Sequence, residues 1–233
     1  MKALLCIHGL LSNEDDYYII KKNLSCMYDY ICIPNIPGHG KNIQKFNYEN
    51  VVNFITLEYD KLSEKYDYID VIGYSIGGVI ASYLAQIRNP HSIILLAPAF
   101  SYINPKNYKY LFCNSSSAKL TKNEIKKKMN YRQIKYFIIF SSIVRKINKQ
   151  IYIFNMPLCV MFGKNDYLVN DKTGQIILSK CKSKYKELLL LDNHDHFNIT
   201  KTNIVSKNII SFLNKIYKIE NNNYGEILWD MNV

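Results

Sequence analysis

The amino-acid sequence predicts an α/β domain in which a mostly parallel β-sheet carries helices on both faces. The first observation is that short, continuously apolar runs alternate along the chain with longer segments of helical periodicity, as expected for buried strands joined by helices. The second is the composition: 48% of the 233 residues are apolar and 21% are charged, which is enough apolar material for one packed core. This balance excludes a disordered chain, a collagen-like repeat and a coiled coil.

Six short apolar runs are the expected strands, at residues 2–7, 30–33, 68–72, 92–96, 158–162 and 186–190. Segments with apolar residues at helical spacing are the expected helices, at residues 14–27, 48–65, 77–88, 171–181 and 202–217. Strands and helices therefore alternate, with one exception after the fourth strand. Repeated βαβ units of this kind predict parallel strands, whose carboxyl ends meet at the same edge of the sheet.

The exception is an insertion between the fourth and fifth expected strands. Residues 101–156 lack the alternation of the rest of the chain, but Thr121 and Glu124 have the spacing of a helix capping box. Apolar residues such as Ile125 and Met129 then recur at helical intervals. We therefore expect a helical cap with an apolar face above the sheet.

This interpretation divides the chain into two parts. Residues 1–100 and 157–233 form the expected core, and residues 101–156 form the expected cap or lid. The C-terminal segment 220–233 is mostly polar with a lone Trp229, and it receives no predicted role.

The turn after the third expected strand has the pattern of a nucleophile. Residues 73–78 read Gly-Tyr-Ser-Ile-Gly-Gly and lie between a strand and a helix, which is the setting of the G-x-S-x-G nucleophile elbow. Ser75 has to adopt a strained backbone conformation to present its hydroxyl, and side chains at Gly73 and Gly77 would collide there. The turn also directs the backbone amide of Ile76 from a helix N-terminus, where negative charge is stabilised.

A serine nucleophile needs a base to take its proton and an acid to orient that base. Asp166 follows the strand at residues 158–162, and His196 follows the strand at residues 186–190. Both candidates therefore lie on the same edge as Ser75, in the chain order Ser, Asp, His that such folds use. His194 remains the alternative base.

These motifs together resemble those of the α/β-hydrolases, and within them the small bacterial carboxylesterases and monoacylglycerol lipases. The likeness covers nearly the whole chain: His-Gly-Leu at residues 8–10, Pro-Gly-His-Gly at residues 37–40, the elbow at Ser75, the cap, Asp166 and His196. Two features depart from the family pattern. Asp195 replaces the usual Gly before the base, and the chain starts directly at the His-Gly strand, without the antiparallel strand pair that usually precedes it.

The resemblance implies a reaction and an oxyanion hole. Ser75 would attack the carbonyl carbon of an ester, His196 would move the proton, and Asp166 would steady the imidazolium. The family donates its oxyanion amides from the residue after His-Gly and the residue after the nucleophile, which here are Leu10 and Ile76. We therefore expect a carboxylesterase or monoacylglycerol lipase that forms an acyl-enzyme and needs no cofactor or metal.

Other functions share these residues or this fold. Thioesterases, amidases and carbon–carbon hydrolases use the same constellation, and a non-catalytic binding protein could keep the fold. We expect His8 and His39 to hold their loops by hydrogen bonds and His91, which follows Pro90, to be exposed. No histidine spacing typical of a metal site is present, and the residues that bind substrate are not identified.

The charge of the chain is concentrated in the expected cap. The formal net charge is +11, and residues 101–156 contain twelve basic residues and one acidic residue, Glu124, while the remainder contains eighteen of each. A basic cap with an apolar face predicts a weak contact with anionic membrane surfaces beside the small acyl-ester substrate. No nucleic-acid module is present, so no nucleic-acid partner is expected. The absence of a signal-peptide pattern and of CxxC motifs predicts a cytoplasmic location.

Overall fold

The computed structural model describes residues 1–100 and 131–230, except for the side chains of residues 132, 133 and 219–230. Within this part of the chain the strands are β1 (Lys2–Ile7), β2 (Tyr30–Cys32), β3 (Tyr68–Tyr74), β4 (Ser92–Leu96), β5 (Leu158–Gly163) and β6 (Lys186–Leu191). The helices are η1 (Glu14–Tyr17, a 3₁₀-helix), α1 (Tyr18–Leu24), α2 (Tyr48–Ser63), α3 (Ile76–Ile87), α6 (Tyr131–Asn148), α7 (Lys172–Ser179) and α8 (Asn203–Asp230).

The six strands form one sheet in the order β2-β1-β3-β4-β5-β6, and every neighbouring pair is parallel. The predicted fold class is therefore confirmed. At the carboxyl edge, Ile7 lies opposite Gly73 and Gly163 lies opposite Leu191. The loops after β1, β3, β5 and β6 consequently leave the sheet at the same edge, and the predicted site residues lie in these loops or, for Ile76, at the start of α3.

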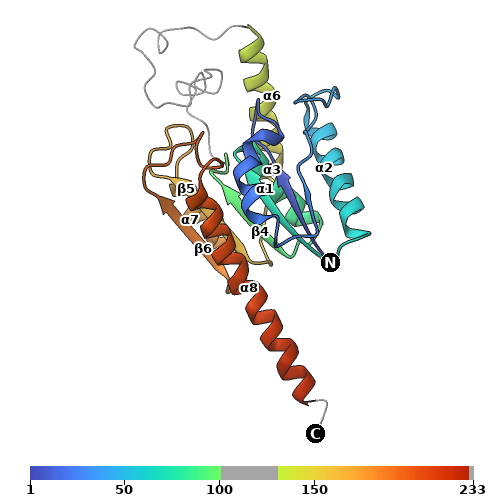
Figure 1. Cartoon of the computed structure of the whole chain (residues 1–233). Coiled ribbons are helices and arrows are strands. Elements are labelled where there is room, and N and C mark those ends of the chain that lie inside the picture. The colour runs from blue at the N-terminus through green and yellow to red at the C-terminus, as the bar shows by residue number, and fades with distance from the viewer. Residues whose placement is uncertain (101–130, 231–233) are drawn as a thin grey trace.

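Helices cover both faces of the sheet (Figure 1). The chain moves across the sheet in one direction from β1 to β2 and in the other direction from β3 to β4, so right-handed crossovers put α1 and α3 on opposite faces. α1 packs against α8, and α3 packs against both α2 and α6.

The apolar core surrounds the central strands. Every residue of β4 and β5 is buried, and β1 and β3 leave only their first residues partly exposed. Strands covered on both faces need apolar residues at every position, which explains why these runs are continuous rather than alternating. The edge strand β2 is more exposed than the central strands, because it has a neighbour on one side only. It ends one residue earlier than predicted.

Two helical segments differ most from their predicted extents, and the other expected helices begin and end within two residues of theirs. The segment 14–27 is divided into η1 and α1, and the Asn13 side chain accepts the Asp15 backbone N–H at the start of η1. Helix α8 continues to Asp230 instead of ending near residue 217, so much of the polar C-terminal segment is helical. Figure 1 shows this part of α8 extending beyond the rest of the protein.

The expected cap is described only from residue 131 onward. There α6 is helical as predicted, and its buried residues Phe140, Ile143 and Ile147 pack into the core beside α3. Thr121, Glu124 and the other residues of 101–130 lie outside the described part of the chain, so the division into core and cap stays a prediction. No helix among the described residues is both long and apolar enough to cross a membrane.

Candidate active site

The predicted nucleophile lies in a strained turn between β3 and α3. Ser75 has φ 55° and ψ −119°, in the region of positive φ that residues other than glycine rarely adopt. Its backbone N–H donates to the Leu96 carbonyl at 2.9 Å, and its carbonyl accepts from the N–H groups of Gly78 at 3.0 Å and Ala99 at 3.1 Å. These bonds hold the strained conformation in place, as expected at a functional site.

The glycines around Ser75 are required by close backbone approach. A Cβ atom on Gly77 would overlap the carbonyl oxygens of Ile7 and His8 at the end of β1, and a Cβ atom on Gly73 would overlap the backbone of Gly77. The G-x-S-x-G spacing thus allows α3 to start directly against the sheet.

His196 connects the serine to the predicted acid. Its Nε2 lies 2.9 Å from Oγ of Ser75, and its Nδ1 lies 2.8 Å from Oδ2 of Asp166. Because a carboxylate only accepts hydrogen bonds, Nδ1 carries the proton and Nε2 accepts from the serine hydroxyl. The side chains of His196 and Asp166 are each 1% exposed, so water does not compete for these bonds.

Asp166 is held on both of its oxygens. While Oδ2 faces His196, Oδ1 accepts the backbone N–H groups of Leu168 at 2.8 Å and Val169 at 2.9 Å. The carboxylate therefore cannot rotate away from the imidazole without breaking two bonds to its own loop.

His194, the alternative base, lies elsewhere. Its Nδ1 lies 2.7 Å from the Asp192 carbonyl oxygen and its Nε2 lies 2.8 Å from Oγ1 of Thr202, just before α8. The structure brings His196, not His194, to Ser75. Asp195 accepts the N–H groups of Phe197 and Asn198 through Oδ1, so its side chain closes the turn that carries His196.

The two predicted oxyanion donors belong to backbone segments on either side of Ser75. Ile76 is the first residue of α3, and the first N–H groups of a helix have no partner within the helix. Leu10 belongs to the loop after β1, and a Cβ atom on the preceding Gly9 would lie 3.6 Å from Cβ of Ser75. Both backbone segments therefore run beside the serine.

Comparison with known proteins agrees with this architecture. A family model for the alpha/beta hydrolase fold matches residues 2–110, and solved structures of lipolytic enzymes superpose on nearly the whole chain. The chain has the α/β-hydrolase fold. A search of curated proteins finds no sequence match.

Three solved structures illustrate the similarity of the fold of this chain to those of known proteins. One belongs to the metagenome-derived lipolytic enzymes LipS and LipT, with 18% identity, a TM-score of 0.69, and coverage of 92% of this chain and 94% of that chain. A lipase-esterase related protein from Clostridium acetobutylicum ATCC 824 has 19% identity, a TM-score of 0.63 and coverage of 91% and 94%. A monoacylglycerol lipase from Paleococcus ferrophilus has 15% identity, a TM-score of 0.66 and coverage of 92% and 93%.

Two further histidines of this chain are buried in the loops where they were expected. His8 accepts the Ile36 backbone N–H at Nε2, and Nδ1 of His39 lies 3.0 Å from the Pro37 carbonyl oxygen. Burial lowers the pKa of His8 to about 4 and also lowers the pKa of His39. Their ring centroids are 5.4 Å apart, so neutral rings also avoid mutual repulsion.

Tyr74 is a site residue that the sequence motif did not reveal. Its hydroxyl donates to the backbone carbonyl of His196 at 2.7 Å, and its ring lies 5.3 Å from the imidazole centroid. A Cβ atom on Gly9 would lie 2.8 Å from the same ring. Tyr74 therefore supports His196 and contacts the loop that carries Leu10, but its position in the elbow is one of the two that the motif leaves free.

The expectation for His91 was wrong. Its side chain is 10% exposed, and its Nδ1 lies 2.8 Å from Oδ1 of Asp70, a fully buried carboxylate near the amino end of β3. Asp70 also accepts hydroxyl groups from Tyr28, Ser92 and Tyr217. Burial by itself would raise the pKa of Asp70, but its bonds to His91, Ser92 and Tyr217 outweigh burial and lower that pKa.

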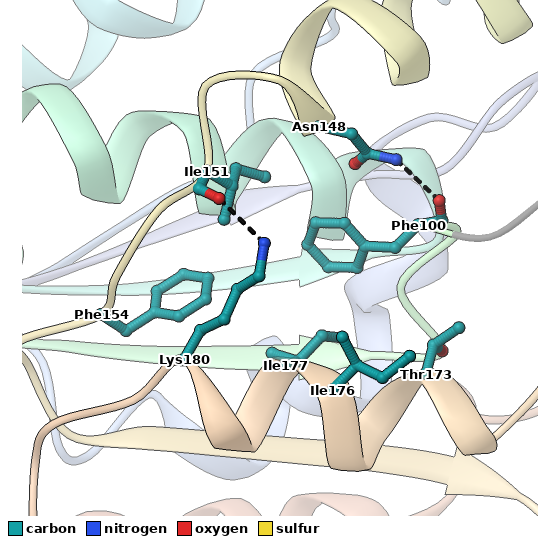
Figure 2. Close-up of a pocket in the computed structure, with 8 residues that line it drawn as sticks. All are labelled: Phe100, Asn148, Ile151, Phe154, Thr173, Ile176, Ile177 and Lys180. Carbon is teal, nitrogen blue, oxygen red and sulfur yellow. Dashed lines mark hydrogen bonds between the residues drawn. The ribbon is translucent and has the colours of Figure 1, made fainter.

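A pocket of about 240 Å³ opens between α6, α7 and the segment after β4 (Figure 2). Its walls are Phe100, Asn148, Ile151, Phe154, Thr173, Ile176, Ile177 and Lys180. Its two most polar groups are already bonded, because Lys180 Nζ donates to the Ile151 carbonyl at 2.9 Å and Asn148 Nδ2 donates to the Phe100 carbonyl at 2.8 Å. Neither Ser75 nor His196 lines this pocket, so it is not the space above Ser75.

Proposed function

We propose that this protein is a serine hydrolase that cleaves carboxylic esters through an acyl-enzyme. The observation that carries the proposal is the hydrogen-bonded chain from Ser75 Oγ through His196 to Asp166, with distances of 2.9 and 2.8 Å. The α/β-hydrolase fold and its lipolytic structural neighbours support an ester hydrolase in general.

The first half of the reaction forms the acyl-enzyme. Ser75 Oγ attacks the ester carbonyl carbon while its proton passes to Nε2 of His196, and Asp166 stabilises the resulting imidazolium. The carbonyl oxygen becomes an oxyanion, which the N–H groups of Leu10 and Ile76 would bind. The intermediate then collapses, the carbon–oxygen bond to the alcohol breaks, and the alcohol leaves with the proton from His196.

The second half returns the enzyme to its starting state. Water attacks the acyl carbon and gives one proton to Nε2 of His196. The second tetrahedral intermediate collapses, the bond to Ser75 Oγ breaks, and His196 returns the proton to the serine. The carboxylic acid leaves, so no cofactor, oxidant or reductant enters the balance.

For the substrate we propose one uncharged acyl ester at a time, as a carboxylesterase or monoacylglycerol lipase would take. The monoacylglycerol lipase from Paleococcus ferrophilus has the same fold over 92% of this chain, which supports this substrate class. The apolar residues of α6 fall into a buried group and an exposed group. Phe140 and Ile143 pack into the core, whereas Tyr131, Ile134 and Ile138 are exposed.

The exposed part of α6 also supports a weak contact with anionic lipid surfaces. Tyr131, Ile134 and Ile138 follow one another at helical spacing and are 82%, 44% and 61% exposed, and Lys135 and Arg145 of the same helix are exposed as well. Exposed apolar groups beside basic ones are typical of helices that lie on membranes. Lys135→Glu should reduce sedimentation with anionic phospholipid vesicles. Lys65→Glu, which changes an exposed lysine just after α2, should not. Equal binding to anionic and neutral vesicles would contradict this contact.

The function itself is tested by ester hydrolysis. Purified protein should hydrolyse p-nitrophenyl esters, and Ser75→Ala should reduce kcat by about 10⁵-fold or more, as the loss of a serine nucleophile does elsewhere. Ser82→Ala is the matched control, because Ser82 is another fully buried serine and donates only to the Gly78 carbonyl one turn earlier in α3. An active Ser75→Ala protein would contradict the proposal.

The same assay separates the related activities. Acyl thioesters and anilides of equal chain length compare thioesterase and amidase activity with ester hydrolysis at the same serine. A series from acetyl to dodecanoyl esters tests the lipid part of the proposal, and activity confined to acetyl esters would contradict it. A protein that binds these compounds without turnover would be the non-catalytic alternative.

A further inference from the structure

His8 is a fully buried side chain with a hydrogen bond at each ring nitrogen. Its Nδ1 lies 2.8 Å from the carbonyl oxygen of Gly9, the next residue, and its Nε2 accepts the backbone N–H of Ile36 at 3.0 Å. The imidazole therefore joins the loop after β1 to the loop after β2. The mechanism described above does not use it.

These two bonds define the tautomer of His8. A backbone N–H can only donate, so Nε2 must offer a lone pair to Ile36 and the ring proton must be on Nδ1. Nδ1–H then donates to the Gly9 carbonyl. Burial lowers the pKa of His8 to about 4, so the ring keeps this neutral form at neutral pH.

The bond to Gly9 has a consequence for the next amide group. A peptide unit is planar and, in this protein, trans, so its C=O and N–H bonds point in opposite directions. The carbonyl of Gly9 and the N–H of Leu10 belong to the same peptide unit. When His8 holds the Gly9 carbonyl on one side of the loop, the Leu10 N–H is turned to the other side.

The loop at Gly9 runs close to Tyr74 and Ser75. A Cβ atom on Gly9 would lie 2.8 Å from the Tyr74 ring and 3.6 Å from Cβ of Ser75. The peptide unit that His8 holds is therefore next to the nucleophile, where a small rotation of the Leu10 N–H would change its direction relative to a reacting carbonyl. The following residue, Leu11, has φ 58°, so this conformation needs support from its neighbours.

We propose that His8 is a positioning residue that directs the Leu10 N–H toward the oxyanion formed at Ser75. This role rests on the proposed function, because it requires an ester carbonyl at the serine. His8 itself does not touch the substrate. Ile36 holds the ring in the required tautomer, and Nδ1–H holds the peptide unit.

Two variants separate the two bonds of His8. In His8→Asn the side-chain amide reaches about as far as Nδ1, so it can still donate to the Gly9 carbonyl but cannot reach Ile36. In His8→Gln the side-chain amide reaches about as far as Nε2, so it can accept from Ile36 but places no donor at Gly9. His91→Ala is the matched control, because it removes another largely buried imidazole, near the opposite edge of the sheet.

The readout is kcat per active site, counted by titration with a fluorophosphonate so that misfolded protein does not contribute. Loss of one oxyanion donor costs about 10²–10³ in kcat, so His8→Gln should lose about 10²-fold in kcat with little change in KM. His8→Asn, which keeps the bond to the Gly9 carbonyl, should keep kcat within about tenfold of the parent. His91→Ala should keep the parent kcat even if its Tm falls.

Three outcomes would overturn the proposal. The first is equal kcat per labelled site for His8→Asn and His8→Gln while the parent is active and labelled. The second is a loss in the His8 variants that follows Tm and is matched by His91→Ala. Both would reject the role of His8 and leave the serine hydrolase intact. The third, a parent that the fluorophosphonate does not label at Ser75, would reject the proposed function and the role of His8 together.

Discussion

Replacing a single oxygen of the Asp166 carboxylate should disturb catalysis without disturbing the loop. In Asp166→Asn the amide oxygen can still accept from Leu168 and Val169, so the loop should keep its shape. The amide nitrogen would then donate toward His196 Nδ1 and leave the ring in the wrong tautomer for Ser75. Comparable changes lower kcat by about 10⁴-fold.

Steady-state kinetics of Asp166→Asn check this expectation. Asp192→Asn is the control, since its carboxylate is 76% exposed and pairs with Lys164 at the surface. A fall of less than tenfold in kcat would mean that Asp166 does not orient the base.

His8 predicts how stability depends on pH. Its pKa is about 4 in the folded protein and about 6.5 when exposed, so between these values the unfolded chain binds one more proton than the folded protein. The contribution of His8 to the free energy of unfolding then falls as the pH decreases, by about 1.4 kcal/mol per pH unit at most. Above pH 6.5 this contribution does not change with pH. Urea unfolding of the parent and His8→Asn at pH 7, 6 and 5 measures this difference, and parallel pH dependence in both would contradict it.

At the scale of elements, the contact between α3 and β1 makes a further prediction. A methyl group in Gly77→Ala would overlap the backbone carbonyls of Ile7 and His8, which cannot rotate away without disturbing β1. We expect a loss of about 3 kcal/mol or more in the free energy of unfolding. Ala85→Gly, near the end of the same helix, should cost about 1 kcal/mol. Chemical denaturation compares the two, and equal losses would show that α3 does not need this close approach.

The elements themselves were predictable where one physical signal dominated. β1 and β4 have their predicted bounds, because runs buried on both faces are apolar throughout. β3, β5 and β6 end one or two residues later than expected. The extension of α8 could not be predicted, since residues 220–230 contain several Asn and a Gly, which are weak helix formers. The burial of His91 depends on Asp70 and Tyr217, which come from other elements, so local sequence gave no sign of it.

The candidate site was predictable to a similar degree. Ser75 and its glycines follow from a local motif, whereas the choice between His194 and His196 depended on a turn that only the folded chain defines. Tyr74 had no signal in the sequence, because its role is a hydrogen bond to a residue 122 positions away. The orientation of the Leu10 amide likewise depends on Ile36 in another loop.

At the scale of the whole molecule, the two edges of the sheet have different tasks. The carboxyl edge holds Ser75, Asp166 and His196, whereas Asp70 lies near the amino edge and accepts groups from β4, α8 and the segment before β2. Asp70→Asn would replace one carboxylate oxygen, which accepts hydrogen bonds, with an amide NH₂ group, which donates them. Four donor groups face this carboxylate, so the NH₂ group would meet donors instead of acceptors. Breaking such a buried centre costs about 3–5 kcal/mol.

We therefore expect Asp70→Asn to lower the free energy of unfolding and to leave kcat unchanged at temperatures where it is folded. Thermal unfolding and ester hydrolysis on the same sample measure both. A loss of kcat without a loss of stability would mean that the two edges are coupled.

The fold by itself leaves the reaction open, because the same architecture carries many chemistries. We propose that Ser75 is a nucleophile activated by His196. The most direct test of this proposal is labelling with a fluorophosphonate, followed by peptide mass spectrometry to locate the modified residue. We expect one label per chain, on Ser75, that His196→Ala largely abolishes and Ser82→Ala leaves unchanged. A chain that is not labelled, or is labelled at another serine, would contradict it.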